Sequence, residues 1–382
     1  MNKILFLNQM AGPMFMEMAE DISEQFPGSI VYTGHDGAFL RKQKDCLIVK
    51  RAPVYTRKSI FSRILSWIKY FGKSLLLSIK TRRQPIIFIV SNPPFLGIIG
   101  WLMNVIRKQQ YVMLVYDVYP DILYAFNKDK KTFFIRLWNK CNKIIYSRAS
   151  LVITIGDDMA QKIQSQVIYS RIEVIRCWAD TQVIKPLDKS QNPFAKKYNL
   201  IDKKVLLYSG NMGYTHNIEL LIESIDLINN SDAHFLFIGE GAKRKSVEEL
   251  LIKHSGCITL LPFQPEELLP YTFPLGDIGF VTYQSGTEGC MVPSKAYYYL
   301  AAGVCLFVIG KAPNELSLTV EKFQCGRVID SNNVKDLVRN INEVIRNPEL
   351  LKRYKENARS VSEKKFSRSN TAQFLSYLNK IK

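Results

Sequence analysis

The polar side chains best placed to do chemistry gather in the segment 286–303, which reads GTEGCMVPSKAYYYLAAG. Four of them can bind or activate a ligand: Thr287, Glu288, Ser294 and Lys295. The apolar runs 277–283 and 304–309 flank the segment and are typical of buried parallel strands. Because proline is tolerated in the first turn of a helix, Pro293 predicts a loop followed by a helix N-terminus. Such a loop, at the carboxyl end of a strand, is where open α/β sheets bind anionic ligands.

Lys295 and Ser294 supply the chemistry that a phosphate or a departing diphosphate requires. They combine a positive charge, a hydroxyl and the free amides of a helix start. Glu288 can accept hydrogen bonds from sugar hydroxyls, so Glu288 and Lys295 are catalytic candidates. The competing interpretation is structural, with a solvated lysine and with the tyrosines at 297–299 in the core.

Polar turns follow three further apolar runs in the second half of the chain. Ser209-Gly-Asn-Met-Gly213 comes directly after the run 205–208, and its glycines let backbone amides approach a diphosphate. The turn 239–244 and the loop 262–265 can contribute in the same way, although a tight βα turn and a simple loop explain them equally well. Together these turns provide the predicted nucleotide-sugar ligands Gly210, Asn211, Gly213, His216, Gly239, Gly241, Lys243, Phe263 and Gln264.

The first half of the chain carries two loops with candidate groups for a second substrate. Ser91-Asn-Pro-Pro-Phe95 follows the apolar run 86–90, and its prolines predict a rigid loop that opens a helix. Asp117 and Asp121 follow the run 111–116, where either carboxylate can bind an acceptor hydroxyl or act as a general base. A helix N-cap explains each aspartate equally well. We take Asp117 as the acceptor-side catalytic candidate, and the predicted acceptor-binding residues are Gly12, Asn92, Pro93 and Asp121.

The segment 57–83, RKSIFSRILSWIKYFGKSLLLSIKTRR, carries eight Lys or Arg and no acid. Its apolar residues recur at helical spacing, and its Trp and Tyr suit the headgroup boundary of a bilayer. This pattern is typical of an interfacial helix on an anionic membrane. The alternative is a helix packed on the sheet with a solvated basic face. The predicted membrane contacts are Arg63, Trp67, Lys69, Tyr70 and Lys73.

These loops need a scaffold that brings strand ends together. Apolar runs alternate with helical segments in both halves of the chain, which predicts βαβ units and parallel sheets. The predicted strands are 4–7, 30–32, 47–49, 86–90, 111–116, 151–154 and 173–175, and then 204–208, 235–238, 258–260, 277–281, 304–309 and 326–329. The predicted helices are 14–26, 58–82, 94–109, 130–148 and 157–167, and then 217–229, 242–254, 293–302, 312–322, 333–346, 349–363 and 369–380.

A chain of 382 residues predicts more than one domain. We predict a Rossmann-like acceptor-binding domain at 1–185 and a Rossmann-like nucleotide-sugar-binding domain at 186–365. A C-terminal helix at 366–382 then packs back on the first domain. Two doubly wound domains that face each other can form a cleft with one substrate in each half.

Composition and motifs exclude several other classes. The four histidines do not pair at ligand spacing, so we predict neither a metal site nor a bound cofactor. Seven scattered cysteines without Cys-x-x-Cys, and an N-terminus unlike a signal peptide, predict a reduced, cytoplasmic protein. There is no Walker loop, no Gly-x-Ser-x-Gly and no nucleic-acid motif. The net charge of +18 therefore favours anionic substrates and an anionic membrane surface as partners.

Taken together, these segments resemble the family 4 retaining glycosyltransferases of the GT-B fold. The nearest resemblance is to bacterial sugar transferases of capsule, O-antigen and colanic acid assembly, including L-fucosamine transferases. It covers nearly the whole chain and rests on Ser91-Asn-Pro-Pro, Tyr116-Asp-Val-Tyr-Pro-Asp121, Arg176-Cys-Trp-Ala-Asp180, Tyr208-Ser-Gly-Asn-Met-Gly213, Gly239-Glu-Gly241 and Pro293-Ser-Lys-Ala-Tyr-Tyr-Tyr-Leu-Ala-Ala-Gly303.

The resemblance implies a UDP-sugar donor in the C-terminal domain and a polyprenyl-diphosphate-linked acceptor at the N-terminal domain. It also implies metal-independent transfer of a hexosyl or N-acetylhexosaminyl group with retained anomeric configuration, on the inner face of the plasma membrane. Many members carry two glutamates eight positions apart. Here Cys290 and Tyr298 occupy those positions, and Tyr298 stands where ribose is bound.

Two other functions remain open at this point. One is a nucleotide-sugar 2-epimerase of the same fold, although the paired carboxylates and histidines of such a site cannot be assembled from this sequence. The other is a non-catalytic, membrane-docked partner in an assembly complex, which the altered glutamate positions suggest.

Overall fold

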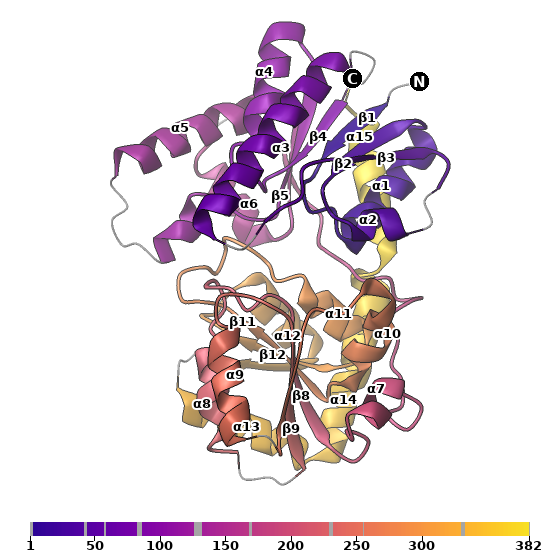
Figure 1. The fold of residues 1–382 in the computed structure, drawn as a ribbon, viewed down its shortest axis with the longest axis vertical. Helices are drawn as coiled ribbons and strands as arrows, with labels where there is room; N and C mark the ends of the chain where they lie inside the picture. Colours follow the sequence, from indigo (N-terminus) through magenta and orange to yellow (C-terminus); the bar gives the residue numbers. More distant parts are fainter. Residues whose placement is uncertain are drawn as a thin grey trace. The chain divides into compact units, whose positions relative to one another are not determined.

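The computed structural model describes residues 3–41, 44–56, 59–81, 86–125, 132–167, 170–228, 232–254, 256–329 and 333–381. The chain forms two compact units (Figure 1). The first unit comprises Met1–Arg176, Gly289–Val292 and Arg368–Lys382, and the second comprises Cys177–Glu288 and Pro293–Ser367. Each unit is built on its own parallel sheet.

The first unit has a seven-stranded sheet in the order β3-β2-β1-β4-β5-β6-β7. Its strands are β1 (Ile4–Leu7), β2 (Ser29–Thr33), β3 (Leu47–Arg51), β4 (Ile86–Val90), β5 (Gln110–Val115), β6 (Leu151–Thr154) and β7 (Ile172–Val174). Every pairing is parallel, and Leu5 of β1 lies opposite Ile30 of β2 and Ile87 of β4. The central strands are apolar throughout because helices cover both faces of the sheet.

The helices of the first unit divide between the two faces of its sheet. They are α1 (Pro13–Gln25), α2 (Gly37–Leu40), α3 (Ile60–Lys80), α4 (Gly97–Arg107), α5 (Phe133–Arg148), α6 (Asp157–Gln164) and α15 (Thr371–Leu378), with short 3₁₀ turns η1 (Asp121–Ala125) and η4 (Arg368–Asn370). The connection from β1 to β2 leads toward the β3 edge of the sheet. The connections from β4 to β5 and from β5 to β6 lead toward the β7 edge. Right-handed crossovers therefore place α1 and the helices α4 and α5 on opposite faces. The C-terminal α15 packs on α1, and α4 packs between α3 and α5.

The second unit has a six-stranded parallel sheet in the order β10-β9-β8-β11-β12-β13. Its strands are β8 (Lys204–Ser209), β9 (Ala233–Ile238), β10 (Ile258–Leu261), β11 (Ile278–Thr282), β12 (Cys305–Ile309) and β13 (Gly326–Ile329). Its helices are α7 (Pro193–Lys197), α8 (Glu219–Ile225), α9 (Arg244–Lys253), α10 (Leu269–Thr272), α11 (Lys295–Ala301), α12 (Glu315–Phe323), α13 (Val334–Ile345) and α14 (Pro348–Lys365), with 3₁₀ turns η2 (Glu266–Leu268) and η3 (Phe273–Leu275). The prediction of two doubly wound parallel-sheet units is confirmed.

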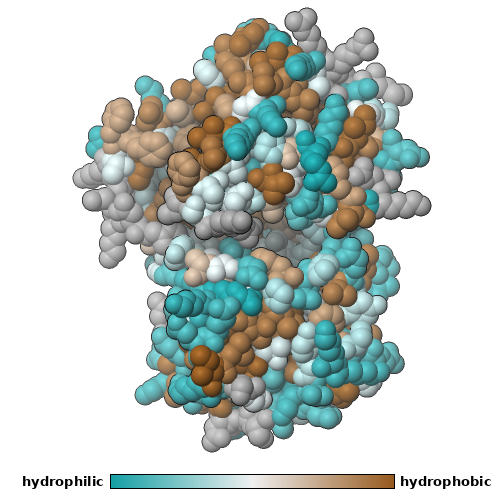
Figure 2. Space-filling view, viewed as in Figure 1, coloured by the Kyte–Doolittle hydropathy of each residue, from teal (hydrophilic) through white to brown (hydrophobic). Residues whose placement is uncertain are grey.

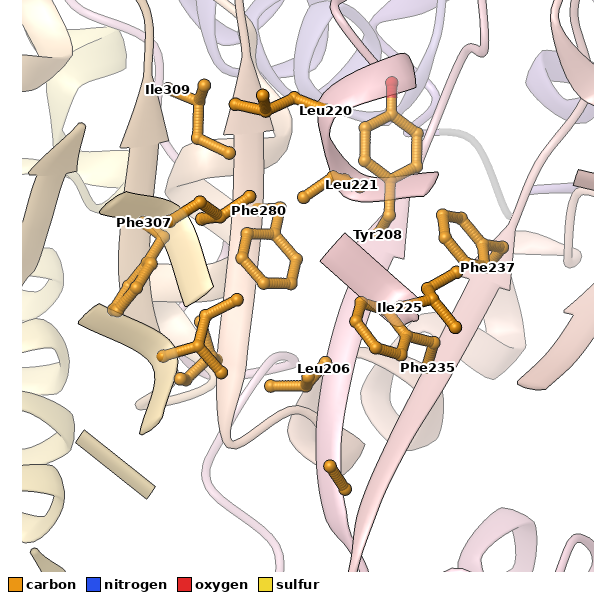
Figure 3. Close-up of a cluster of buried hydrophobic side chains, with 14 of the residues drawn as sticks. Leu206, Tyr208, Leu220, Leu221, Ile225, Phe235, Phe237, Phe280, Phe307 and Ile309 are labelled. Carbon is orange, nitrogen blue, oxygen red and sulfur yellow. The ribbon is translucent and has the colours of Figure 1, made fainter. Parts of the chain in front are cut away.

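Apolar side chains of neighbouring strands and of α8 form the core on one face of this sheet (Figure 3). Phe235 and Phe237 come from β9, Phe280 from β11 and Phe307 from β12, and all four are buried. The strand order reverses between β8 and β11, since β9 lies on the other side of β8. In doubly wound sheets, ligands bind outside the carboxyl ends of the strands at such a point. The loops after β8, β9 and β11 are therefore the place to look for a site.

Candidate functional site

Lys295 is the most unusual charged residue of the second unit. It opens α11, and only 8% of its surface is exposed. Its Nζ atom has no hydrogen-bond partner among the described residues, and it lies 3.5 Å from the ring centroid of Tyr208. Burial holds the pKa of Lys295 well below its usual value of 10.5. A buried ammonium with an aromatic face as its contact lacks the anion that would stabilise its charge.

Tyr208 and Tyr299 fix this lysine against the end of β8. The hydroxyl of Tyr208 donates to the carbonyl oxygen of Asn211 over 2.8 Å. The hydroxyl of Tyr299 accepts from the amide of Ser209 at 2.8 Å and donates to the carbonyl oxygen of Leu207 at 3.1 Å. Because Tyr299 lies one helical turn after Lys295, these bonds hold α11 and the strand end together. Sequence reasoning missed Tyr208, although an aromatic residue just before a glycine turn was a usable signal.

The two glycine-rich turns after β8 and β9 bind each other. The amide of Gly210 donates to Ile238, and the amide of Met212 donates to Glu240, both over 2.8 Å. A Cβ atom on Gly239 would lie 1.9 Å from the carbonyl oxygen of Gly210, and the φ of Gly239 is +146°. Gly241 has a φ of +151°, and a Cβ atom there would lie 2.5 Å from the carbonyl oxygen of Met212. These two glycines are therefore required by contact between the turns, as the tight-turn interpretation proposed.

Two backbone amides of the turn after β8 remain available to bind a ligand. Within the part of the chain that the structure describes, the amides of Asn211 and Gly213 donate no hydrogen bond, whereas those of Gly210 and Met212 do. The ideal Cβ position of Gly210 lies 3.6 Å from the Nζ atom of Lys295. The turn thus places two unused N–H donors on the strand end that also carries the unpaired ammonium.

His216 follows this turn and is neutral at pH 7. Burial lowers its pKa to about 3, and the nearby Lys295 ammonium adds to the effect. Its Nδ1 atom lies 2.9 Å from the carbonyl oxygen of Thr282, so Nδ1 carries the proton and Nε2 can accept. Lys243 donates to the carbonyl oxygen of His216 at 2.6 Å and to Glu219 at 2.7 Å. Lys243 therefore braces His216, and its predicted phosphate contact stays a prediction.

Two predicted ligands in the loop after β11 instead support the loop itself. Thr287 is fully buried, and its hydroxyl donates to the carbonyl oxygen of Gln284 over 2.7 Å. The side chain is enclosed and its proton is used, and its predicted donor contact stays a prediction. Glu288 accepts from the amide of Gly286 at 2.7 Å and from the amide of Lys311 at 2.9 Å. Its proposed sugar contact and catalytic role stay predictions.

The remaining donor-side candidates are more dispersed. Ser294 is exposed at the start of α11 and makes no capping hydrogen bond. Tyr298 stacks on Phe273, with ring centroids 5.1 Å apart. Phe263 is 45% exposed after β10, and Gln264 donates to the carbonyl oxygen of Pro262. Since β10 is separated from β8 by β9, the residues after β10 lie beyond the two turns that bind each other.

In the first unit, the structure builds a pocket around Asp117, at the carboxyl ends of β4 and β5. Ser91, Asp117, Tyr119, Trp138 and Asn142 are among its lining residues. Ser91 accepts from the amides of Tyr116 and Asp117, at 3.1 and 3.2 Å, and so positions the aspartate. Burial raises the pKa of Asp117 to about 6. Ser91 belongs to a loop that the sequence singled out, but this role was not predicted for it.

A short segment from the middle of the loop after β11 belongs to the first unit. Met291 forms an antiparallel bridge with Asp117, and the amide of Val118 donates to the carbonyl oxygen of Cys290 over 2.8 Å. The Sγ atom of Cys290 lies 3.0 Å from the Nζ atom of Lys162. Cys290, for which the resemblance implies a family glutamate position, therefore makes contacts inside the first unit.

The predicted acceptor residues lie on three different loops of the first unit. Asn92 follows β4 and precedes the buried Pro93 through a cis peptide bond. Asp121 opens η1, and its Oδ2 atom lies 3.4 Å from the Nε2 atom of Gln166. Gly12 precedes α1, and a Cβ atom there would meet nothing within 4 Å. Their role in acceptor binding stays a prediction.

The basic segment forms α3, and its ends at residues 57, 58, 82 and 83 lie outside the described residues. Lys69 and Lys73 are exposed, whereas Trp67 stacks on Tyr55 with ring centroids 6.3 Å apart. Arg63 lies with its guanidinium carbon 6.0 Å from the Trp67 ring. Tyr70 is fully buried and donates to the carbonyl oxygen of Tyr32. We therefore correct the prediction that Tyr70 contacts a membrane.

No three His, Cys, Asp or Glu side chains within the described ranges gather closely enough to hold a metal ion. No described helix combines the length and the apolar character that crossing a bilayer requires.

Comparison with known proteins places this geometry in context. Residues 190–361 match the family model described as glycosyl transferases group 1. The chain is 30% identical over 297 residues to WbjE of Pseudomonas aeruginosa, named as a glycosyltransferase, covering 76% of this chain and 74% of that one. It is 27% identical over 171 residues to WcaI of Escherichia coli K12, named for colanic acid biosynthesis, covering 44% and 41%.

A solved structure, HepE of Anabaena in complex with UDP and glucose, shares the fold over the full length of both chains. The TM-score is 0.77, at 16% sequence identity, with 100% of each chain covered. The expected GT-B fold is therefore confirmed.

Proposed function

The chain belongs to the glycosyl transferases group 1 family, and on that premise we propose that it transfers a sugar from a UDP-sugar to a polyprenyl-diphosphate-linked acceptor. The proposed setting is the assembly of a bacterial surface polysaccharide at the inner face of the plasma membrane. One observation carries the donor half of this proposal, namely the buried, unpaired ammonium of Lys295. A diphosphate would supply the anion that this ammonium lacks.

The turn after β8 supports a diphosphate at this place. The amides of Asn211 and Gly213, which donate to no described residue, can bind phosphate oxygens. The neighbouring amides of Gly210 and Met212 hold the turn in position from its other side. The donors are thus oriented before the ligand arrives, which is what electrostatic stabilisation of a leaving group requires.

We propose retention of anomeric configuration without a metal ion. The acceptor hydroxyl attacks the anomeric carbon on the face from which the diphosphate leaves, and its proton passes to the departing phosphate oxygen. Negative charge grows on that oxygen as the glycosidic bond breaks, and Lys295 with the two free amides stabilises it. Neutral His216 can accept a hydrogen bond from a sugar hydroxyl through Nε2. On the acceptor side, Asp117 is the proposed hydrogen-bond acceptor.

The relatives support the class of substrate that we propose. WcaI is named for colanic acid biosynthesis, and HepE was solved with UDP and glucose. A polysaccharide pathway and a UDP-linked donor are the corresponding proposals for this chain.

Donor binding is tested by calorimetry with UDP and with UDP-sugars. Lys295→Met should weaken UDP binding by at least tenfold, because it removes a charge-assisted hydrogen bond. The matched control is Lys245→Met, since the Lys245 side chain is 84% exposed in the same unit and should leave binding unchanged. Equal UDP affinity in the two variants would contradict the proposed site. Epimerised donor formed without acceptor would favour a 2-epimerase instead.

A further inference from the structure

Six large apolar residues of α3 are exposed to solvent. Its buried positions recur every fourth residue and are mainly small and polar: Ser66, Tyr70, Ser74 and Ser78. Its exposed large apolar residues are Phe61, Ile64, Leu65, Ile68, Leu76 and Ile79, between 38% and 77% exposed. A helix packed on a sheet normally shows the opposite pattern, with its apolar stripe inward. Packing within the first unit therefore does not explain these six apolar side chains.

The neighbouring helices continue this exposed apolar surface. α4 packs between α3 and α5, and it exposes Val105 and Ile106. α5 exposes Phe133, Phe134, Leu137 and Ile144, with Phe133 81% exposed. The three helices hold 48 of the 382 residues but 12 of the 25 exposed large apolar side chains recorded over the described ranges. Figure 2 shows hydrophobic surface over this part of the first unit.

The same three helices are basic and contain no acid. α3 contributes four Lys or Arg, α4 contributes one and α5 contributes four, which makes nine in total. These residues are Arg63, Lys69, Lys73, Lys80, Arg107, Arg136, Lys140, Lys143 and Arg148. Among the residues of these helices there is no Asp or Glu to offset the charge. We call the outward surface of α3, α4 and α5 the basic apolar face.

We propose that the basic apolar face is a docking surface for an anionic lipid bilayer. The two features that define it, exposed apolar side chains and uncompensated positive charge, match the acyl boundary and the headgroups of such a bilayer. Lysine side chains on this face can extend past the apolar residues to reach phosphate headgroups. Protein interfaces, by contrast, are depleted in lysine at their cores. The proposed docking surface extends beyond α3 to α4 and α5. It excludes Tyr70, whose side chain is buried.

Vesicle co-sedimentation with the full chain tests the contributions of positive charge and of apolar insertion separately. Wild-type protein should bind vesicles of phosphatidylcholine with one third phosphatidylglycerol, and bind phosphatidylcholine alone much more weakly. Added salt should reduce binding to the anionic vesicles because it screens the exposed charges. Equal binding to both vesicle types at low and high salt would overturn the proposal.

Two variants test the two contributions. Lys69→Ala/Lys73→Ala/Lys140→Ala should weaken binding to anionic vesicles about hundredfold, since each basic residue near such a surface contributes about fivefold. Ile68→Ser/Ile106→Ser/Phe133→Ser should weaken binding to a comparable degree through lost apolar insertion. The matched control is Lys245→Ala/Ile252→Ser on α9 of the second unit, where Ile252 is 88% exposed. It should bind like the wild type.

Two further measurements control for misfolding of the variants and for self-association through the basic apolar face. UDP binding, read by calorimetry, should be unchanged in all three variants, which shows that they are folded and separates this proposal from the proposed donor site. Analytical ultracentrifugation without lipid should show the same oligomeric state for wild type and variants. A dimer that the Ile68→Ser/Ile106→Ser/Phe133→Ser variant dissolves would assign the face to a second copy and overturn the lipid proposal. Loss of vesicle binding by the α9 control as well would also overturn it.

Discussion

Replacing Lys295 with methionine should make the unliganded protein more stable and at the same time remove its response to UDP. Methionine fills a similar volume without a charge, so the buried ammonium no longer has to be held away from water. An unpaired buried polar group costs about 1–3 kcal/mol. The loss of the cation–π contact with Tyr208, worth about 0.5–2 kcal/mol, offsets part of the gain. We expect a net gain of about 1 kcal/mol, which would raise Tm by about 2–4 °C for a domain of this size.

UDP should stabilise the wild-type protein more than Lys295→Met. At a UDP concentration of a hundred times Kd, binding stabilises the wild-type protein by about 2.7 kcal/mol. A hundredfold weaker Kd in Lys295→Met, equivalent to about 2.7 kcal/mol, would reduce that stabilisation to about 0.4 kcal/mol at the same concentration. The variant should therefore melt above the wild type without UDP and below it with UDP.

The pH dependence of stability tests whether the charge of Lys295 destabilises the unliganded protein. Because burial lowers the pKa of Lys295 in the folded state, the unfolded chain binds more protons between that lowered pKa and 10.5. The free energy of unfolding of the unliganded wild type should then rise with pH across this window. Lys295→Met lacks the titrating group, so its advantage over the wild type should shrink as the pH approaches 10.5.

Differential scanning calorimetry of wild type, Lys295→Met and the exposed-lysine control Lys245→Met, with and without UDP and at a series of pH values, measures all three effects. The control should match the wild type in each condition, because Lys245 is largely exposed. A Lys295→Met protein that is less stable without UDP, and keeps the full UDP-induced shift, would refute the reasoning.

Three further predictions follow from single contacts. Gly239→Ala should destabilise the protein by about 1–3 kcal/mol and weaken UDP binding, because its Cβ would collide with Gly210, whereas Gly12→Ala, with open space around it, should be nearly neutral by calorimetry. Transferase activity should fall below about pH 6 as Asp117 is protonated, and Asp117→Asn should lower activity at least hundredfold and abolish that acidic limb in a pH–rate profile. Tyr70→Phe should cost about 1 kcal/mol in denaturant unfolding by removing its bond to Tyr32, while vesicle binding stays unchanged.

The sheets were readable from sequence because nearly every strand is apolar and lies between polar turns. The central strands β1, β4, β8 and β11 are buried on both faces, so their composition alone identified them. The position of a candidate residue was predictable where it depends on local sequence, as for Lys295 at the start of α11. Thr287 looked equally suitable, but its side chain is buried and its hydroxyl donates to the carbonyl oxygen of Gln284. Those contacts depend on how the loop turns, which residue types do not specify.

Periodicity identified α3 as a helix but did not give the direction of its faces. An amphipathic pattern defines two faces, and either can lie against the sheet. The serines at 66, 74 and 78 were the signal, since small residues at four-residue spacing allow a helix to approach a sheet closely. The assignment of Gly289–Val292 to the first unit had no comparable signal, because pairing with Asp117 joins residues far apart in the sequence.

The mutual hydrogen bonds between the turns after β8 and β9 limit how either turn can be altered. A Cβ atom on Gly239 would collide with Gly210, and the two turns share hydrogen bonds, so a replacement in one turn has to fit the other. A chimaera that exchanges residues 209–213 alone would join two surfaces selected in different proteins. Exchanging both turns together keeps their mutual hydrogen bonds, which makes them one unit for engineering.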